Sequence, residues 1–410
     1  MKNSRPSRLL LSILVATGLA LPSASHADVR KWTDTKGVSV EADFVKQDDS
    51  TVTVKLKNGK EVPIPKARLS AADLEFLKTQ SGGGTTPGSG SATPPAKDVS
   101  FDKVKIDKRG WTRKVEKLDI SSVDLAVQLQ TEHFHIAGTT KVKPDLVDAY
   151  GESLERLYVH LTRAMPGMAA VFKDRRMLIL ITEDTKTHEA LMKNLDSKGF
   201  NQGGPGAICY MNTDDAFQEA HKVLQRGRVF FAGDNVGKQK NMKWQQRIHF
   251  VVSDLWDEYL GDLKQENDYS FSLIDLSVSY YFEYDISGDI ETKVSFGMFG
   301  GNVEGFKNGR AWGATVKNLL KSPANRPGIE KLLKTPAQKS EPIDIGSGFG
   351  MVQWIFRNPA RLAKFNELLE FAKKEGKVIP PLEFVKTMGF ESTESFDKEW
   401  TTFMNSPEFK

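Results

Sequence analysis

Two stretches of the sequence contain half of the pattern that binds catalytic zinc. That pattern places histidines at positions i and i+4 on one face of a helix, with a glutamate after the first as general base. His249 matches the first ligand, but Phe250 stands at the position of the base and Ser253 at that of the second histidine. His188-Glu189 begins a second such pattern, in which Met192 replaces the second ligand. The sequence therefore predicts no catalytic zinc at either place.

Other residues with reactive side chains lack partners in the sequence. His133 and His135 lie two apart on the predicted strand 125–136, so their side chains would face the same side of it. They could form half of a metal site, but no pair of carboxylates is near them in the sequence. We therefore expect both histidines to have a structural role. We interpret Cys209 as a small buried hydrophobic residue and the helix of His188 as solvated surface. Asp214 and Asp215 are adjacent carboxylates, but nothing in the sequence places a partner with a raised pKa opposite them, as acid–base catalysis would need.

Composition narrows the classes of function. A single cysteine excludes a disulfide framework and a thiolate zinc site. Gly297–Gly301 lacks the Lys-Ser/Thr of a phosphate-binding loop, and Lys238–Lys240 is a short charged run expected in solvent. With 57 basic and 53 acidic residues the net charge is +4, which gives no electrostatic case for nucleic acid. We predict no cofactor.

The first 27 residues have the pattern of a secretory signal peptide. Lys2, Arg5 and Arg8 precede an apolar run of about 13 residues, and Ser25-His26-Ala27 forms a small-residue cleavage site. The run is short of the roughly 20 residues that span a bilayer. Cleavage would leave a net charge of +4 − 3 = +1. We expect a periplasmic or extracellular protein without integral membrane association.

Residues 28–79 follow as a small β module. Residues 38–45 and 51–56 alternate as strands, and Asn58-Gly59 before the strand 61–64 indicates a two-residue hairpin. Ser70 is a candidate N-cap with Asp73 three residues later. Short strands and one helical turn in about 50 residues predict an SH3-like barrel.

This module resembles the type-one Sla homology domain. The resemblance rests on Arg30–Asp34, Val40–Val45, Val54–Val62 and Pro65–Asp73, in that order. The resemblance implies an SH3-like fold. The family's eukaryotic examples bind short Asn-Pro-Phe-type peptides in endocytic adaptors. For exported bacterial proteins of similar build, the resemblance does not imply which ligand is bound. Trp32 and Phe44 could line a peptide groove, although we expect both in the core.

A linker and a large domain complete the chain. Residues 80–99 are rich in Gly, Ser and Pro and cannot bury a core, so the parts on either side are expected to move independently. Residues 100–410 predict an α+β domain. Its expected strands are 125–136, 177–182, 204–211 and 228–231, its early helices are 145–164 and 186–195, and its second half is helical.

The large domain resembles the peptidase-MA-like gluzincins, which are thermolysin-type. Thr131–Ile136, the Leu-Ile-Leu strand, Gly348–Phe371 and Phe396–Trp400 carry the resemblance. It implies a zinc-bearing helix at 245–256 and a third ligand from the helix 273–283, where the register falls on Leu276.

Neighbouring carboxylates do not repair that site. Glu283 lies two turns, about 10 Å, beyond Leu276, while Asp254 points about 100° away and Asp257 lies a turn further along. The degenerate site is therefore His249, Phe250, Ser253 and Leu276.

The sequence thus predicts an exported non-enzymatic protein that binds a peptide or protein through its SH3-like domain, joined to a pseudo-metallopeptidase. A groove beside the lost site would be made apolar by Phe250, Leu276 and Tyr280 or Tyr281. The alternative is an active exported hydrolase or zinc metallopeptidase with a non-standard site.

Overall fold

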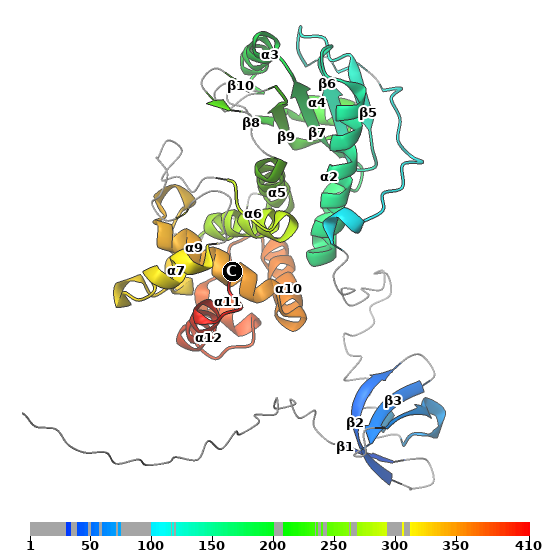
Figure 1. Ribbon diagram of the computed structural model, residues 1–410, viewed down its shortest axis with the longest axis vertical. Helices are drawn as coiled ribbons and strands as arrows, with labels where there is room; N and C mark the ends of the chain where they lie inside the picture. The colour runs from blue at the N-terminus through cyan, green and yellow to red at the C-terminus, as the bar shows by residue number, and fades with distance from the viewer. Residues whose placement is uncertain are drawn as a thin grey trace, which may run out of the picture. The chain divides into compact units, whose positions relative to one another are not determined.

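The protein consists of two compact units, residues 1–92 and 93–410, in a computed structural model (Figure 1). The structure describes residues 30–33, 39–47, 51–56, 60–70, 73–74, 100–115, 117–118, 120–200, 208–233, 235–236, 239–240, 244–261, 263, 269–292, 306 and 312–410. The predicted signal peptide and Gly297–Gly301 lie outside these residues, as do Asn58-Gly59 and all of the linker before residue 100. Each unit is considered by itself.

The first unit is an antiparallel sheet. Its strands are β1 (Arg30–Thr33), β2 (Ser39–Gln47), β3 (Thr51–Leu56) and β4 (Glu61–Pro65), and they pair in sequence order. The predicted strands 38–45, 51–56 and 61–64 are confirmed as β2, β3 and β4. The 3-10 turn η1 (Lys66–Arg68) follows β4.

The alternation of β3 explains the core of this unit. Val52 and Val54 point inward and are fully buried, as expected for alternate residues of a half-exposed strand. The predicted cap is also present: Asp73 N–H donates to Ser70 Oγ at 3.2 Å. Asp73 Oδ2 accepts from the backbone N–H of Thr33 at 2.7 Å, which ties the helical turn to β1.

The second unit contains a mixed five-stranded sheet in the order β5-β6-β7-β9-β8. β6, β7 and β9 are parallel, and the edge strands β5 and β8 are antiparallel to their neighbours. The bounds are Val127–Gln130 (β5), Phe134–Gly138 (β6), Arg176–Thr182 (β7), Ile208–Asn212 (β8) and Val223–Phe231 (β9).

The prediction of one strand over 125–136 is wrong, because the chain turns within it. Thr131 N–H donates to Phe134 O at 2.9 Å, and Phe134 N–H donates back to Thr131 Oγ1 at 3.0 Å. This tight turn joins β5 to β6. The apolar alternation runs through the turn without a Gly or Pro to mark it, so periodicity alone could not find it.

Helices cover both faces of the sheet. α2 (Pro144–Ala164) packs on the face of Ile136 and Ile179, and α3 (Thr185–Ser197) packs on the face of Leu178 and Leu180. Both helices were predicted. The short α4 (Asp215–His221) follows β8, and the 3-10 segments η2 (Phe101–Lys103) and η3 (Pro166–Phe172) flank α2. Among the described residues, α4 is the one α-helix between strands of this sheet that was not predicted.

The rest of the chain is largely helical, as predicted, and α5 connects it to the sheet (Figure 1). α5 packs on β9 and on α6, and α6 packs in turn on α9. The helices are α5 (Trp244–Leu260), α6 (Ser272–Ser287), α7 (Gly313–Leu319), α8 (Ile329–Lys334), α9 (Pro342–Phe356), α10 (Pro359–Glu375), α11 (Pro381–Thr387) and α12 (Thr393–Asn405).

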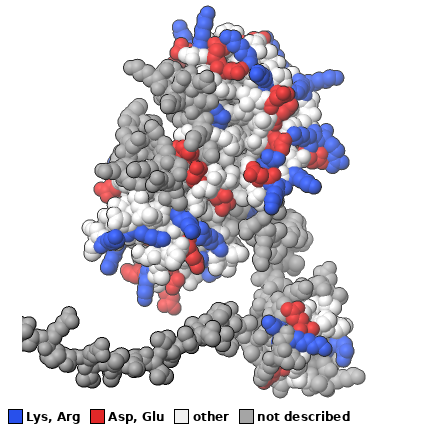
Figure 2. All heavy atoms as spheres, viewed as in Figure 1, with Lys and Arg blue, Asp and Glu red and all other residues white. Residues whose placement is uncertain are grey.

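Among the helices described, none combines the length and the apolar composition needed to cross a membrane. On the face shown in Figure 2, basic and acidic side chains are interspersed over the second unit. This agrees with the nearly balanced charges of the sequence.

Candidate functional sites

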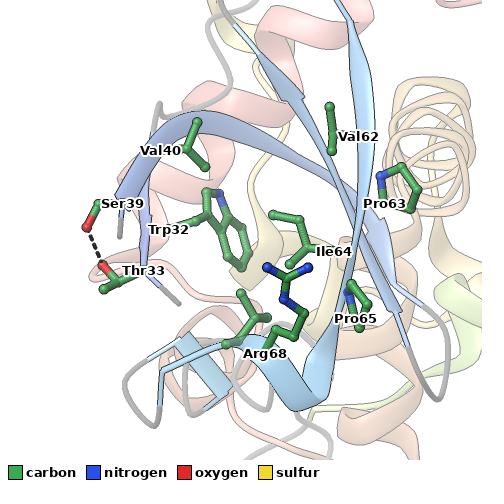
Figure 3. Close-up of a pocket in the computed structure, with 10 residues that line it drawn as sticks. Trp32, Thr33, Ser39, Val40, Val62, Pro63, Ile64, Pro65 and Arg68 are labelled. Atoms are coloured by element: carbon green, nitrogen blue, oxygen red, sulfur yellow. Dashed lines mark hydrogen bonds between the residues drawn. The ribbon is translucent and has the colours of Figure 1, made fainter. Parts of the chain in front are cut away.

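The first unit carries a shallow apolar groove of about 240 Å³ (Figure 3). It lies between the paired ends of β1 and β2 on one side and β4 with η1 on the other. Its apolar lining is Trp32, Val40, Val62, Pro63, Ile64, Pro65 and Leu69, and its polar lining is Thr33, Ser39 and Arg68.

Trp32 is both the floor of this groove and part of the core. Only 1% of its surface is exposed, and its Nε1–H donates to Ala42 O at 3.1 Å. The expectation of a core role is thus confirmed for Trp32. Phe44 lies on β2, opposite Val54, but its side chain is outside the described part of the chain.

The rim of the groove is accessible to a ligand. Val40 is one of two large exposed hydrophobic residues among those described, at 38% exposure. The side chain of Arg68 rises from η1 toward Ile64 and Trp32 (Figure 3). Thr33 Oγ1 and Ser39 Oγ form a hydrogen bond of 3.0 Å at the opposite edge. Apolar surface beside one guanidinium suits a short peptide with an apolar anchor and a carboxylate.

The second candidate site lies between α5 and α6, which run antiparallel. His249 Nδ1 lies 3.3 Å from Glu283 Oε2, at ion-pair distance although the geometry makes no hydrogen bond. Glu283 was expected too far along α6 to reach the site, because the family register placed Leu276 opposite His249. That register was wrong, since the helices pack with Glu283 opposite His249.

Ser253 and Leu276 lie together at another point of the same interface. Both line a pocket of about 450 Å³, whereas His249 and Phe250 do not line it. Ser253 Oγ donates to Asp275 Oδ2 at 3.1 Å. The four positions of the degenerate site therefore do not converge on one point. Tyr280 and Tyr281, expected to border a groove, are buried and do not line the pocket either.

Two carboxylates line this pocket, Asp257 and Asp275. Burial raises the pKa of Asp275 well above its usual range, and the negative charge of Asp257 raises it further. Burial also raises the pKa of Asp257, against the lowering effect of Arg226, whose Nη2 lies 3.1 Å from Asp257 Oδ2. Carboxyl groups with raised pKa values in a pocket mark a candidate functional site.

Asp254, which follows Ser253 on α5, forms a buried ion pair with Arg228 of β9. Asp254 accepts from Arg228 Nη2 at 2.7 Å and also from Arg228 Nε. Asp254 points away from His249 toward β9, as its helical position predicted. Burial raises the pKa of Asp254, although Arg228 opposes this effect. Arg228 is therefore neutralised by its own partner and does not compensate Asp275.

The structure corrects the interpretation of His188. It is fully buried, not solvated, and its Nδ1 lies 2.6 Å from Thr182 Oγ1. The charged neighbours of His188 occupy the outer face of α3, while the histidine faces the sheet. Met192 is buried on the same helix.

His133 and His135 have different partners, because His133 lies in the β5–β6 turn. His133 Nδ1 lies 2.7 Å from Glu155 Oε2 of α2, and its ring stacks on Tyr158. His135 Nε2 lies 3.0 Å from Gln128 Oε1 of β5. The structural role expected for both is consistent with these contacts.

Cys209 and Asp214 serve the fold. Cys209 is 3% exposed within the second core cluster, as interpreted from the sequence. Asp214 is the N-cap of α4 and accepts from Phe217 N–H at 2.8 Å. In the part of the chain that the structure describes, no three His, Cys, Asp or Glu residues are grouped to hold a metal ion.

The sequence argument missed Asp275. The only signal was its place as the one charged residue in the first ten of α6, where its neighbours are apolar or small. Asp257 was considered only as a zinc ligand. Its proximity to Asp275 depends on how α5 packs on α6, which one helix's periodicity does not reveal.

An antiparallel β unit with an apolar groove and an accessible rim defines a small ligand-binding module. Residues 21–83 match the family model of SLA1 homology domain 1, SHD1. The match covers all of the predicted segment 28–79 and extends beyond it at both ends. It suggests a role in protein binding. No curated protein matches the chain.

Proposed function

We propose that the protein is an exported, non-enzymatic binding protein whose SHD1 domain captures a short peptide segment of a partner. The groove over Trp32 carries this proposal, because it combines a buried aromatic floor with the exposed Val40 and Arg68. An apolar anchor would lie on Trp32 and Ile64. A carboxylate of the peptide would pair with the guanidinium of Arg68.

The binding test uses residues 28–410 and fluorescein-labelled peptides that contain one Phe and one Asp. Val40→Gln should weaken binding at least tenfold, since it puts an amide into the apolar rim. The matched control is Leu382→Gln, which changes the second exposed hydrophobic residue, 50% exposed on α11. Equal affinities of the two variants would refute the groove. Trp32→Ala is unsuitable alone, because it also empties the core.

We further propose that the second unit is a pseudo-metallopeptidase that retains a peptidase-like arrangement without the zinc ligands. The antiparallel α5 and α6 beside a mixed sheet support this proposal, as do Phe250 and Ser253 at the positions of the base and the second ligand. The alternative, an exported hydrolase with a non-standard site, is favoured by one observation: Asp257 and Asp275 line the same pocket.

Metal analysis after dialysis, combined with hydrolysis of a mixed peptide library, separates these proposals. The pseudo-peptidase is expected to hold no stoichiometric zinc, because a zinc site needs three or four protein ligands, and to cleave nothing. Stoichiometric zinc or chelator-sensitive cleavage would establish a metallopeptidase. Chelator-insensitive cleavage that is lost in Asp275→Asn would establish a carboxylate hydrolase.

Export is tested by fractionation of cells that express the full chain. Cleavage after Ala27 and recovery outside the cytoplasm are expected, and N-terminal sequencing of the recovered protein gives the cleavage point. A mature protein that still begins at residue 1 in the cytoplasm would refute export.

A further inference from the structure

The pocket between α5 and α6 has features of a ligand site that neither the SHD1 groove nor a lost zinc centre accounts for. It lies where the C-terminal end of α5 meets the N-terminal end of α6 and has a volume of about 450 Å³. Its lining includes the apolar residues Trp256, Leu260, Leu263, Phe271, Leu276 and Val378. It also includes the polar residues Ser253, Asp257, Ser270, Ser272 and Asp275.

Asp275 is the least satisfied charged group of this pocket. Its Oδ2 accepts from Ser253 Oγ, but its Oδ1 is buried without a hydrogen-bond partner in the described part of the protein. Leaving a carboxylate oxygen buried and unpaired is costly. A cationic ligand beside this carboxylate would offset part of this cost.

The surrounding cations are already engaged. Arg228 is bound by Asp254 through both its Nε and its Nη2. Arg226 lies 3.1 Å from Asp257, and its backbone N–H donates to Glu258. The charges that act on Asp275 are Asp254 and Asp257 on α5 and Arg226 on β9. Since Arg226 pairs with Asp257 and Asp254 pairs with Arg228, no cation is left to pair with Asp275 among these groups.

We propose that this pocket binds an organic cation, a primary ammonium group on an apolar chain. The ammonium pairs with the carboxylate of Asp275 and lies near Asp257, and the chain packs on Trp256, Leu260 and Phe271. A compact ammonium suits this carboxylate better than a planar guanidinium, because a guanidinium binds best to two free carboxylate oxygens and Asp275 Oδ2 already accepts from Ser253. This proposal goes beyond the peptide-binding function and does not depend on it.

A metal ion fits the pocket less well. Hard divalent cations take six or more oxygen ligands, and zinc takes four close ligands. The described residues contain no group of three metal-binding side chains, here or elsewhere. An ion would also leave the apolar lining residues uncovered, whereas an alkyl chain would pack on them.

Binding is expected to release a proton. Burial and the charge of Asp257 raise the pKa of Asp275, so the unoccupied pocket retains a proton over a wider pH range than an exposed carboxyl group. An ammonium ion binds the ionised carboxylate. Affinity should therefore rise with pH until the amine itself loses its proton, near pH 10 for an alkylamine.

The test is isothermal titration calorimetry of residues 28–410 with n-hexylamine, using 1-hexanol as a neutral probe of the same length. At pH 7 the amine should bind at least tenfold more tightly than the alcohol. Its measured enthalpy should vary with the ionisation enthalpy of the buffer, since a proton is released. Equal affinity for the two probes, or no binding of the amine, would overturn the proposal.

A pair of variants locates the site. Asp275→Asn should weaken amine binding at least tenfold and leave alcohol binding unchanged. Asp285→Asn makes the same change near the other end of α6, where Asp285 pairs with His160, and should have no effect. Unchanged amine binding in Asp275→Asn, or displacement of the amine by one equivalent of Zn²⁺, Ca²⁺ or Mg²⁺, would contradict the assignment. The comparison of probes on the unmodified chain remains decisive if a variant fails to fold.

Discussion

His249 Nδ1 lies 3.3 Å from Glu283 Oε2 in the interface of α5 and α6, where neither side chain is more than 4% exposed. Glu283 also holds the chain beyond α6, because its Oε1 accepts the backbone N–H groups of Glu291 at 2.6 Å and Thr292 at 2.8 Å. The ring of Tyr280 meets His249 edge-on at 4.4 Å. Glu283 therefore has a structural role in fixing the end of α6.

Glu283→Ala should destabilise the second unit by about 3–5 kcal/mol, because it orphans two buried N–H groups and leaves His249 without its partner. Glu283→Gln should cost less, since its amide oxygen can still accept those N–H groups. Urea unfolding followed by tryptophan fluorescence measures both. A loss below about 1 kcal/mol for the alanine variant would contradict this role.

The sequence located the helices of this interface but not its pairings. The resemblance implied helices over 245–256 and 273–283, and both are present as α5 and α6. Which residues face each other depends on the rotation and shift of one helix against the other, set by side chains across the whole interface. For that reason the sequence did not predict that His249 lies opposite Glu283, and the resemblance placed Leu276 there. The pocket that Asp257 and Asp275 line was not predicted either.

Gly348 allows α9 to approach α6 closely. A Cβ at this position would overlap Ser277 Oγ and lie 3.3 Å from Ser277 Cβ. Ser277 is fully buried, with its Oγ donating to Leu273 O at 2.6 Å, so it has little freedom to move. Gly348→Ala should therefore destabilise the protein by about 1–3 kcal/mol through overpacking, measured as a shift of the urea midpoint.

The control for this change is Gly110→Ala, where a Cβ would meet nothing within 4 Å. It should leave the midpoint unchanged. In a double-mutant cycle, Ser277→Ala should recover part of the loss caused by Gly348→Ala, because it removes the overlapping oxygen. Simple additivity of the two changes would argue against a direct clash.

The structure of the first unit was easier to predict from the sequence than the α5–α6 interface, because its contacts join residues close in the chain. Alternation gives β2 and β3, and a Ser-x-x-Asp pattern gives the cap at Ser70, since each signal involves residues close in the chain. The groove depends on β1, β4 and η1 meeting around Trp32, with Arg68 at the rim. The sequence suggested Trp32 but gave no sign of Arg68, which reaches the groove through the turn after β4.

His135 should make the second unit sensitive to acid. Burial lowers the pKa of His135 to about 4, with smaller contributions from His221 and Arg176. The folded state therefore keeps the imidazole neutral, and the unfolded chain binds its proton at about pH 6.5. The stability is fully present above pH 6.5 and is lost as the pH falls toward 4, by up to about 3 kcal/mol.

His135→Gln should flatten this loss, because glutamine does not titrate. Thermal melts from pH 7 to pH 4 compare the two proteins. His160→Gln, which changes a histidine paired with Asp285 near the surface, should retain the loss between pH 6.5 and 4. An acid sensitivity of His135→Gln equal to that of the unmodified protein would contradict the assignment.

Asp275→Asn should stabilise the protein at neutral and alkaline pH. Because the pKa of Asp275 is raised in the folded state, the folded protein holds a proton that the unfolded chain releases at about pH 3.9. Stability therefore falls as the pH rises from about 4 through the raised value, by about 1.4 kcal/mol for each unit of pKa. Asparagine removes this loss, so the unfolding curves should coincide at pH 4 and diverge at pH 8, with the variant more stable.

Asp254→Asn provides the contrast, because the Asp254 carboxylate accepts from Arg228 Nη2 at 2.7 Å in a buried ion pair. Its replacement leaves a buried guanidinium without a charged partner and should destabilise the protein by about 3–5 kcal/mol at pH 8. The Asp-to-Asn change is therefore expected to destabilise the protein at Asp254 on α5 and to stabilise it at Asp275 on α6. A loss of stability in Asp275→Asn at pH 8 would show that its carboxylate is compensated in the folded protein, and the pocket would then have no excess charge for an ammonium ligand.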